Sequence, residues 1–189
     1  YHKVKLRGTA FYQLVDQWIL WSPDSTNTYR PDNIKKVKAR GFETSTEFEW
    51  KVRSFSQTVR GSYQFTKSTT EEASLAEAAS IGKQLIYTPL HTAAASIVSR
   101  FKNWSANVFL QYSGVRFTEA SNSPVYSLAP YLLTDFSIGK SFINTRHALN
   151  AQFVVKNVFD VEYKQYSGRA MSGRNFNLQI SYHLTHKPK

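Results

Sequence analysis

The sequence contains no cysteine among its 189 residues, and no apolar run in it approaches the length of a membrane helix. The lack of cysteine excludes a disulfide framework, a thiolate zinc site and a cysteine nucleophile. A membrane helix needs about 20 consecutive apolar residues, so a helical membrane protein is excluded as well. A transmembrane β-barrel is not excluded, because its apolar residues alternate with polar ones along each strand.

Acidic residues are scarce: 13 Asp and Glu stand against 24 Lys and Arg, which gives a formal net charge of +11. A basic balance can indicate nucleic acid, an anionic membrane surface or an acidic ligand as partner. The only dense basic run is "KKVKAR", residues 35–40, and such a run is most often the solvated face of an element. We therefore expect no nucleic-acid partner.

Motifs of catalysis and metal binding are also missing. No Gly-x-Ser-x-Gly elbow, phosphate-binding loop or His-Glu-x-x-His spacing occurs. Glu47 and Glu49 share one strand face, an arrangement that suits the wall of a lumen better than acid–base chemistry. The sequence predicts a protein that is not an enzyme and has neither a metal site nor a cofactor.

Aromatic residues are abundant, at 15% of the chain, and they alternate with polar residues. In the last predicted strand, Phe176, Leu178, Ile180, Tyr182 and Leu184 alternate with Asn175, Asn177, Gln179, Ser181 and His183. This period of two indicates β-strands with one apolar and one polar face. The pattern predicts an all-β fold with eight strands, at about residues 2–20, 29–51, 56–69, 84–101, 104–118, 126–143, 147–164 and 173–185.

These strands are long, and their connections alternate in length. Strands of a soluble sandwich average about 5–6 residues, whereas several here reach about 15, enough to cross a bilayer at a tilt. Short connections are predicted near residues 53–55, 102–103 and 144–146, and long ones near 18–33, 69–84, 117–128 and 164–174. Short turns at one end and long loops at the other are typical of outer-membrane barrels.

Two local features are predicted within this pattern. The segment after Ser68 is expected to form a short helix, with Thr69 or Thr70 as its cap and Gly82 at its end. The apolar positions of the second strand change parity at Gly41, from odd to even numbers. Because a slip of one residue reverses the faces of a strand, we expect a β-bulge near Arg40 and Gly41.

Aromatic residues gather near both ends of the predicted strands. Two aromatic belts separated by smaller apolar residues are what a bilayer selects at its two interfaces. Cross-strand pairing in a sandwich core is the other explanation of such aromatics. The predicted belt residues are Trp50, Trp104, Tyr112, Phe142, Tyr163, Phe176 and Tyr182.

Three stretches resemble TonB-dependent outer-membrane receptors, in the C-terminal part of their barrel. They are "NIKKVKARGFE" (33–43), "GKQLIYTPLHTAAASI" (82–97), and "NVFDVEY" followed by "MSGRNFNLQISY". The residues that match the near-terminal signature are Asn157, Phe159, Asp160, Tyr163, Gly173 and Arg174; Ser172 stands where the family usually has proline. The order and spacing of the three stretches carry the resemblance across almost the whole chain.

The resemblance implies a transmembrane antiparallel β-barrel segment, about eight strands of a 22-stranded barrel plugged by an N-terminal domain. Residues 1–189 would be its C-terminal portion, with the plug and earlier strands elsewhere in the protein. It implies a receptor in the outer membrane of a Gram-negative bacterium that imports a scarce ligand (an iron–siderophore complex, haem or cobalamin) with energy from TonB.

The resemblance also implies the partners of such a receptor. They are the lipid bilayer, lipopolysaccharide, the small-molecule ligand, TonB through the N-terminal region, the rest of the barrel and a surface lipoprotein. Trp and Tyr offer large contact areas, and Arg suits anionic groups. The ligand-contact candidates in the long loops are Trp18, Trp21, Tyr29, Arg30, Tyr126, Tyr166 and Arg169.

Two other classes stay open at the level of sequence. Eight strands can close a barrel of their own, which would make this a self-contained structural or adhesive outer-membrane protein. A soluble β-sandwich that binds a ligand is the third class, and the length of the strands disfavours it.

Overall fold

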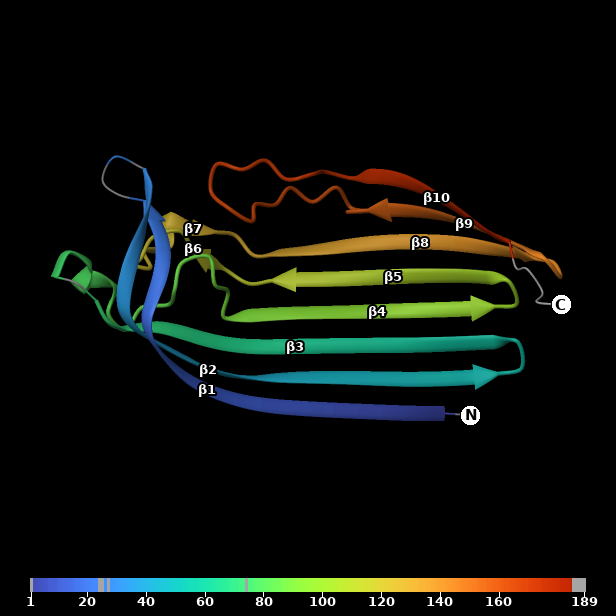
Figure 1. Cartoon of the computed structure of the whole chain (residues 1–189), viewed down its shortest axis with the longest axis horizontal. Coiled ribbons are helices and arrows are strands. Elements are labelled where there is room, and N and C mark those ends of the chain that lie inside the picture. The colour runs from blue at the N-terminus through green and yellow to red at the C-terminus, as the bar shows by residue number, and fades with distance from the viewer. Residues whose placement is uncertain (1, 24–25, 27, 74, 185–189) are drawn as a thin grey trace.

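The computed structural model describes residues 2–23, 26, 28–73 and 75–184. Eight strands form one antiparallel sheet in the order β1-β2-β3-β4-β5-β8-β9-β10, and two short strands pair beside it. Figure 1 shows the short turns at one end of this sheet and the long loops at the other. The strands are β1 (His2–Pro23), β2 (Tyr29–Val52), β3 (Phe55–Glu72), β4 (His91–Phe101), β5 (Trp104–Ser113), β6 (Arg116–Phe117), β7 (Ser127–Leu128), β8 (Tyr131–Ile143), β9 (His147–Lys156) and β10 (Asn175–Leu184). Two 3₁₀ helices lie in the loops, η1 (Leu75–Ser80) and η2 (Pro124–Tyr126).

The predicted all-β fold and its eight-stranded sheet are confirmed, and so are the three short turns. Arg53 and Lys102 each begin a turn with positive φ, 51° and 52°. Backbone bonds join neighbouring turns: Lys102 N donates to Ser54 O at 3.2 Å, and Ser141 N donates to Asn103 O at 2.9 Å. The short-turn end of the sheet is therefore continuous from β2 to β8.

Register keeps the two faces of the sheet separate. Lys5 pairs with Glu47 and Glu47 with Arg60, so the polar residues of three strands share one face. On the other face Val59 pairs with Ile97 and Ile97 with Val108. Directly opposite residues of a β-ladder point to the same side. We call these sides the polar face and the apolar face.

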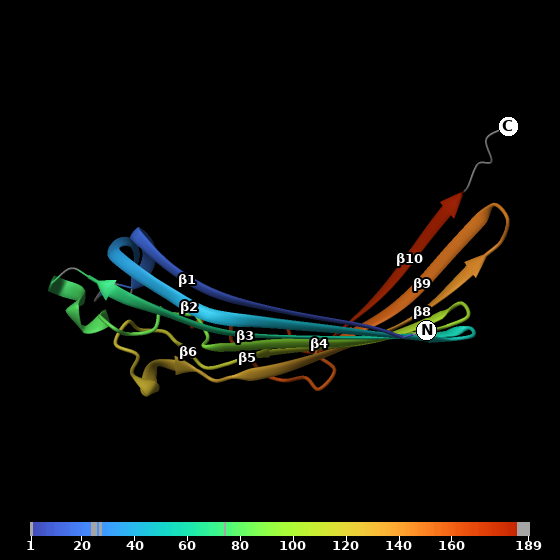
Figure 2. The same cartoon turned by 90° about the horizontal axis from the view of Figure 1, so that it is seen from below.

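The sheet is curved and open. Figure 2 shows it bent into a trough, with β1 and β10 along its two rims. A hollow along β1–β5 is lined mainly by polar-face residues, among them Arg7, Glu43, Gln64 and Gln111. Apolar residues of the opposite face remain exposed, including Leu6 at 78% and Leu178 at 67%. The fold thus presents a polar concave wall and an uncovered apolar exterior.

Several strand ends differ from the prediction. β4 begins at His91 rather than at residue 84, because Tyr87 has φ 56° and proline at position 89 cannot donate to a ladder. β5 ends at Ser113 rather than at 118, and β8 begins at Tyr131 rather than at 126. β9 ends at Lys156 rather than at 164, because Asn157 turns the chain with φ 50°.

The first long loop is shorter than predicted. β1 and β2 stay paired far beyond the neighbouring strands, to Trp21↔Pro31 and Pro23↔Tyr29. Most of the predicted loop 18–33 is therefore a projecting β-hairpin, which Figure 1 shows rising from the long-loop end of the sheet. Gln17, with φ 59°, interrupts the regular strand conformation at its base.

The predicted helix is present only in part. Thr69 and Thr70 continue β3 instead of capping a helix, and the helix is a single 3₁₀ element, η1. The strand extends because Thr70 forms a bridge with Ile81, so the returning chain supplies its hydrogen-bond partner. Gly82 does follow the helix closely, with φ 74°, and its N–H donates to Thr70 O at 2.7 Å.

The predicted bulge near Gly41 is wrong. The ladder between β2 and β3 is regular there, and its register shifts between Lys36 and Val37 instead. The change in apolar parity has another cause: Val37 stays on the polar side of the sheet but is covered by Leu85 of the following loop. Gly41 serves close packing, because a Cβ atom there would lie 1.9 Å from Phe65 O and 2.9 Å from Phe11 Cζ.

Candidate functional site at the long-loop end

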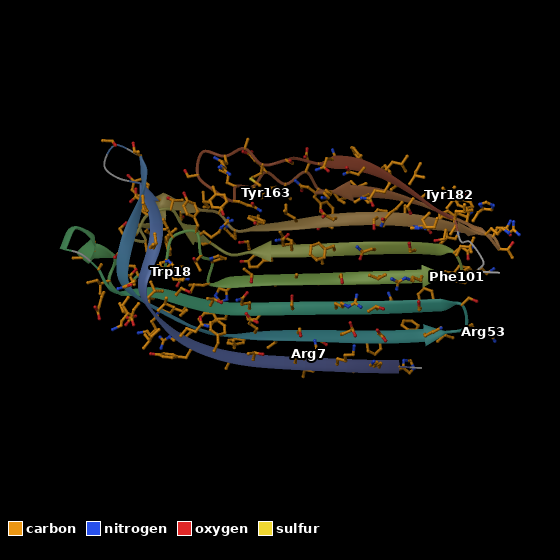
Figure 3. All side chains as sticks on the ribbon, viewed as in Figure 1. Arg7, Trp18, Arg53, Phe101, Tyr163 and Tyr182 are labelled. Carbon is orange, nitrogen blue, oxygen red and sulfur yellow. The ribbon has the colours of Figure 1, made fainter. Side chains whose placement is uncertain are left out.

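The apolar face carries an aromatic belt at each end. Near the short turns, Trp50 contacts Phe55 edge-on at 5.7 Å between ring centroids, and His147 Nδ1 lies 2.6 Å from Tyr182 Oη. Figure 3 shows Phe101, Tyr182 and Arg53 at this end of the sheet. Trp104 pairs directly with Phe101, and Phe142 lies on the same face of β8. These residues form the short-turn belt.

A second group lies toward the long loops. The ring of Phe42 is 5.8 Å from those of both Tyr63 and Phe65, and Phe65 lies 5.3 Å from His91. Tyr63 Oη and His91 Nδ1 are joined at 2.7 Å. Two predicted belt residues belong to this group. Tyr112 of β5 lies on the same face, and the ring of Phe176 of β10 stacks on that of Phe153 of β9, with 6.1 Å between the ring centroids.

Tyr163 does not belong to this outward belt. Its ring packs at 4.9 Å on Tyr131, a buried residue that lines the polar hollow. Tyr163 lies in the loop after β9, outside the long strands, and burial, with Tyr131 and Asp135 nearby, raises the pKa of its phenol. The predicted outward position of Tyr163 is wrong, because β9 ends seven residues earlier and the loop folds back over the polar face.

The polar wall holds a charge row across three strands. Glu47 accepts hydrogen bonds from Lys5 Nζ at 2.6 Å and from Arg60 Nε at 2.7 Å. Each residue lies directly opposite its neighbour in the ladder, so the row costs little side-chain reorganisation. It orders the wall at mid-strand height and leaves the long-loop end free for other contacts.

Two long loops are bound to each other by a reciprocal amide pair. Gln84 N donates to Asn122 Oδ1 at 2.7 Å, and Asn122 Nδ2 donates to Gln84 O at 2.9 Å. The Gln84 side chain also accepts from Ser68 N at 3.0 Å, which fixes the loop to β3. Tyr87 N then donates to Phe117 O at 2.8 Å. The loops after β3 and β5 therefore form one structural unit.

The last long loop joins this unit through aromatic rings. Tyr166 packs on Tyr87 at 5.2 Å, and the Arg169 guanidinium lies 5.9 Å from the Tyr166 ring. We call Tyr87, Tyr166 and Arg169 the rim cluster. Tyr166 is half exposed and Arg169 is exposed, so both can still meet a ligand. Two of the predicted contact residues are thus brought together, with Tyr87 added by the fold.

The other predicted contact residues lie apart from the rim cluster. Trp18 is partly exposed on the projecting hairpin, and Tyr126 is exposed in η2. The side chains of Trp21, Tyr29 and Arg30 lie outside the part of the structure that is described. Tyr87 could not be predicted from local sequence, because its contact with Tyr166 spans 79 positions along the chain.

The contact between Arg116 and Tyr131 was also not predicted from the sequence. Arg116 is buried, lies 4.7 Å over the Tyr131 ring and donates from Nη2 to Ala129 O at 2.8 Å. It thereby links the Tyr131–Tyr163 ring pair to the loop after β5. The long-loop end thus holds this buried group of tyrosine and arginine in addition to the rim cluster.

The signature residues after β9 hold a turn. Asn157 is buried: its Nδ2 donates to Val161 O at 3.0 Å, and its Oδ1 accepts from Val161 N at 2.9 Å. Asp160 Oδ1 accepts from Arg174 N at 2.7 Å, and a Cβ on Gly173 would lie 2.9 Å from the same oxygen. These contacts close the turn and fix the start of β10, so they position the last loop. Phe159, the remaining signature residue, is largely exposed.

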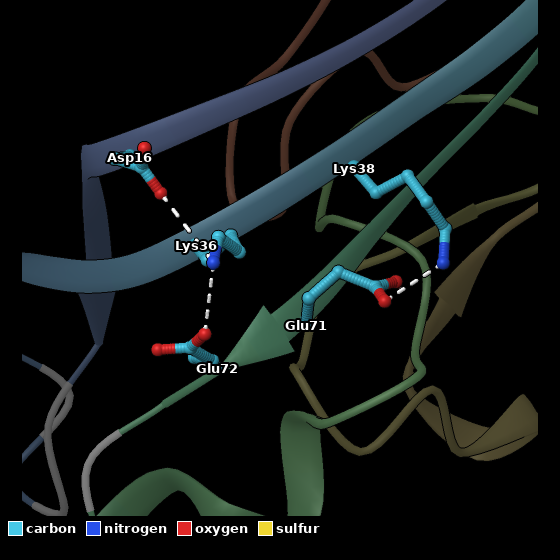
Figure 4. Close-up of polar contacts among 5 residues, drawn as sticks. All are labelled: Asp16, Lys36, Lys38, Glu71 and Glu72. Atoms are coloured by element: carbon cyan, nitrogen blue, oxygen red, sulfur yellow. Dashed lines mark hydrogen bonds and ion pairs between the residues drawn. The ribbon is translucent and has the colours of Figure 1, made fainter.

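The basic run of β2 is partly neutralised by carboxylates, as Figure 4 shows. Lys36 Nζ lies 3.0 Å from Glu72 Oε1 and 3.8 Å from Asp16 Oδ1, and Lys38 donates to Glu71 at 2.7 Å. These groups lie on the long-loop side of the Phe42 belt. The Lys38 ammonium and the Thr69 hydroxyl hold the pKa of Glu71 below its usual range, and the hydrogen bond to Glu72 raises the pKa of Lys36.

Among the residues that the structure describes, no three His, Cys, Asp or Glu side chains come together in a group that could hold a metal ion. Within the same residues, no helix has both the length and the apolar character needed to cross a membrane.

A curved antiparallel sheet with a polar concave wall, an apolar exterior and loops gathered at one end defines a segment of a large β-barrel. A family model described as "TonB dependent receptor-like, beta-barrel" matches residues 2–158. The chain belongs to this family of transport receptors. No match is found among curated protein sequences.

Solved structures agree in fold. The ferric-catecholate import receptor Fiu from E. coli K12 superposes with a TM-score of 0.65 at 20% identity, over 95% of this chain and 25% of its own. The copper transporter OprC gives 0.69 at 13%, over 97% and 29%. The ferric yersiniabactin receptor FyuA from Yersinia pestis gives 0.60 at 18%, over 96% and 27%. The chain therefore spans between a quarter and three tenths of these proteins.

Proposed function

We propose that this chain is the C-terminal part of an outer-membrane receptor that binds a scarce ligand at its long loops and imports it with energy from TonB. The observation that carries the proposal is the rim cluster, because it gathers tyrosine and arginine side chains from separate loops at one end of a barrel wall. The family match to residues 2–158 supports it. Plug, TonB contact and earlier strands would lie in the rest of the protein, and the apolar face would contact lipid of a Gram-negative outer membrane.

The chemistry of the rim cluster narrows the ligand class. Arg169 offers a planar cation that suits carboxylate, catecholate or phosphate groups, and the tyrosine rings offer flat contact area. Iron–siderophore complexes, haem and cobalamin all fit this description. Copper is added to the ligands worth testing, because the similar OprC is described as a copper transporter.

A self-contained eight-stranded barrel is the alternative proposal, and the topology disfavours it. Closure would require β1 to pair with β10. Within the described residues, β1 pairs with β2 and β10 with β9, and the two outer strands stand at opposite rims of the sheet. Unpaired edges of this length need partner strands, which the remainder of a larger barrel would supply.

Uptake in a deletion strain tests the proposal. The full gene is deleted, and growth or accumulation is measured with ferric siderophores, haem, cobalamin and copper as sole sources. Complementation with the wild-type gene should restore one of these. The Arg169→Ala variant should restore about tenfold less of it than wild type, whereas a control Val125→Ala variant, changed at an exposed residue of η2, should restore it fully. Unchanged uptake of all four classes in the deletion strain would contradict the proposal.

A further inference from the structure

Lys140 occupies an unusual place on the apolar face. It pairs with Trp104 across β5 and β8, between Ile138 and Phe142 on the same side of its strand. A cation on a lipid-facing barrel surface costs about 2–4 kcal/mol at the midplane of a bilayer and close to nothing at the interface. Its position beside the short-turn belt therefore places its ammonium group at the level of the lipid headgroups.

Two aromatic rings flank this ammonium group. Lys140 Nζ lies 4.6 Å from the Trp104 ring centroid and 5.0 Å from that of Phe142. Lys102 Nζ lies 5.3 Å from the ring of Phe101, which is Trp104's direct partner. Among the described residues, no ion pair involves either lysine. Rings hold the stem of a lysine while its charge stays available to a ligand.

Positive charge predominates at the short-turn end of the sheet. Lysine and arginine occur in or beside every short turn, whereas Glu49 is the only acidic residue of this band and points to the polar face. The basic residues of the band are Lys3, Lys51, Arg53, Arg100, Lys102, Lys140 and Arg146. Of these, Lys3, Lys51 and Arg100 lie on the polar face with Glu49, and Lys140 lies on the apolar face. Figure 3 shows Arg53 and Phe101 together at this end. Carboxylates concentrate instead at mid-strand and in the long loops.

We propose that Lys140 and Lys102, held by Trp104, Phe142 and Phe101, form a binding site for the phosphate group of an anionic phospholipid in the leaflet that meets the short turns. The rings pack along the upper acyl chain and glycerol, and the two ammonium groups face the phosphate. A backbone bond from Ser141 N to Asn103 O at 2.9 Å ties β8, which carries Lys140, to the turn that carries Lys102, and so keeps the two cations in a fixed relation. The proposal rests on the membrane location given under the proposed function.

The test uses the full-length receptor in phosphatidylcholine nanodiscs. One set of nanodiscs contains about 20% phosphatidylglycerol, which is an anionic lipid, and the other set contains none. Native mass spectrometry counts the phosphatidylglycerol molecules retained on the released protein. Each lysine near a membrane surface adds enough attraction for about a fivefold gain in affinity. Lys140→Gln should therefore retain about fivefold less phosphatidylglycerol, and Lys140→Arg should retain as much as wild type.

Lys67→Gln is the matched control, because Lys67 lies on the same face at the long-loop end, paired with Arg40. It should leave retention unchanged. Trp104→Leu tests the ring contact and should lower retention without changing charge. Equal retention by wild type and Lys140→Gln, or equal loss in the Lys67→Gln control, would overturn the site while the barrel proposal stands. Failure of the wild-type protein to enter nanodiscs would overturn both, and the two failures are thus distinguishable.

Discussion

Replacement of Asn157 by alanine tests how the turn after β9 is held. Alanine removes two hydrogen bonds to Val161, which contribute about 1 kcal/mol each. It also leaves alanine at φ 50°, a left-handed conformation that asparagine tolerates through its side-chain hydrogen bonds and alanine does not, at a cost of about 1 kcal/mol. The sum is about 3 kcal/mol, which corresponds to an increase of about 150-fold in the open population of the turn.

Glycine and aspartate at the same position separate the two causes. Asn157→Gly removes the hydrogen bonds but accepts the positive φ, so its cost should be about 2 kcal/mol, or about 30-fold. Asn157→Asp still accepts from Val161 N but cannot donate to Val161 O, so it should fall between wild type and glycine.

Amide hydrogen exchange of the full-length receptor in nanodiscs measures these effects. The amides to follow are Val158 N, bonded to Thr134 O at 2.8 Å, and Arg174 N, bonded to Asp160 Oδ1 at 2.7 Å. Local opening of the turn exposes both, while amides in β4 and β5 serve as an internal reference. Equal exchange in the alanine and glycine variants would refute the role assigned to φ. Wild-type exchange in all three would refute the role of the side chain.

Three further predictions follow from contacts described above. Gly41→Ala should destabilise the barrel by about 1–3 kcal/mol in urea unfolding, because the new Cβ would collide with Phe65 O. Gly8→Ala is the control and should have little effect, since a Cβ at Gly8 would meet nothing within 4 Å. Equal effects of the two substitutions would contradict the close packing at Gly41. Arg169→Ala should weaken binding of an anionic ligand by about tenfold in titration calorimetry, and unchanged affinity would remove it from the site. Because the folded-state pKa of Glu71 lies below its ordinary 4.5, its stabilising contribution is complete above pH 4.5 and declines as the pH falls through the lowered value. Amide hydrogen exchange at the Glu71 end of β3, followed at graded acid pH, should show this decline in wild type and lack it in Glu71→Gln.

The sequence predicted those parts of the fold that depend on period and local turn chemistry. Alternation along β5 and β10 assigned each residue to a face, and the register of the sheet confirms the assignment. Short turns followed from breaks in that alternation. The resemblance singled out Asn157 and Asp160, and the structure shows hydrogen bonds of both side chains that close the turn after β9.

What failed depended on contacts between distant segments. Val37 was expected to mark a bulge because its apolar side chain lies on the polar side, and only the arrival of Leu85 explains its place. Thr70 was expected to cap a helix because the pairing of its backbone with Ile81 cannot be read from local propensity. Tyr163 was placed outward because the alternation of β9 was extended past the turn at Asn157.

The reciprocal amide pair between Gln84 and Asn122 has a consequence for engineering. Loops of barrel receptors invite transplantation, since each one can be excised between two strands. Here the loop after β3 supplies both the donor and the acceptor that the loop after β5 needs. A chimaera that exchanges only the loop after β5 would leave the backbone N–H and C=O of Gln84 without these partners. One that exchanges only the loop after β3 would have to present the same two backbone groups to the Asn122 amide. Segments 73–90 and 114–130 therefore have to be inherited together as one cassette.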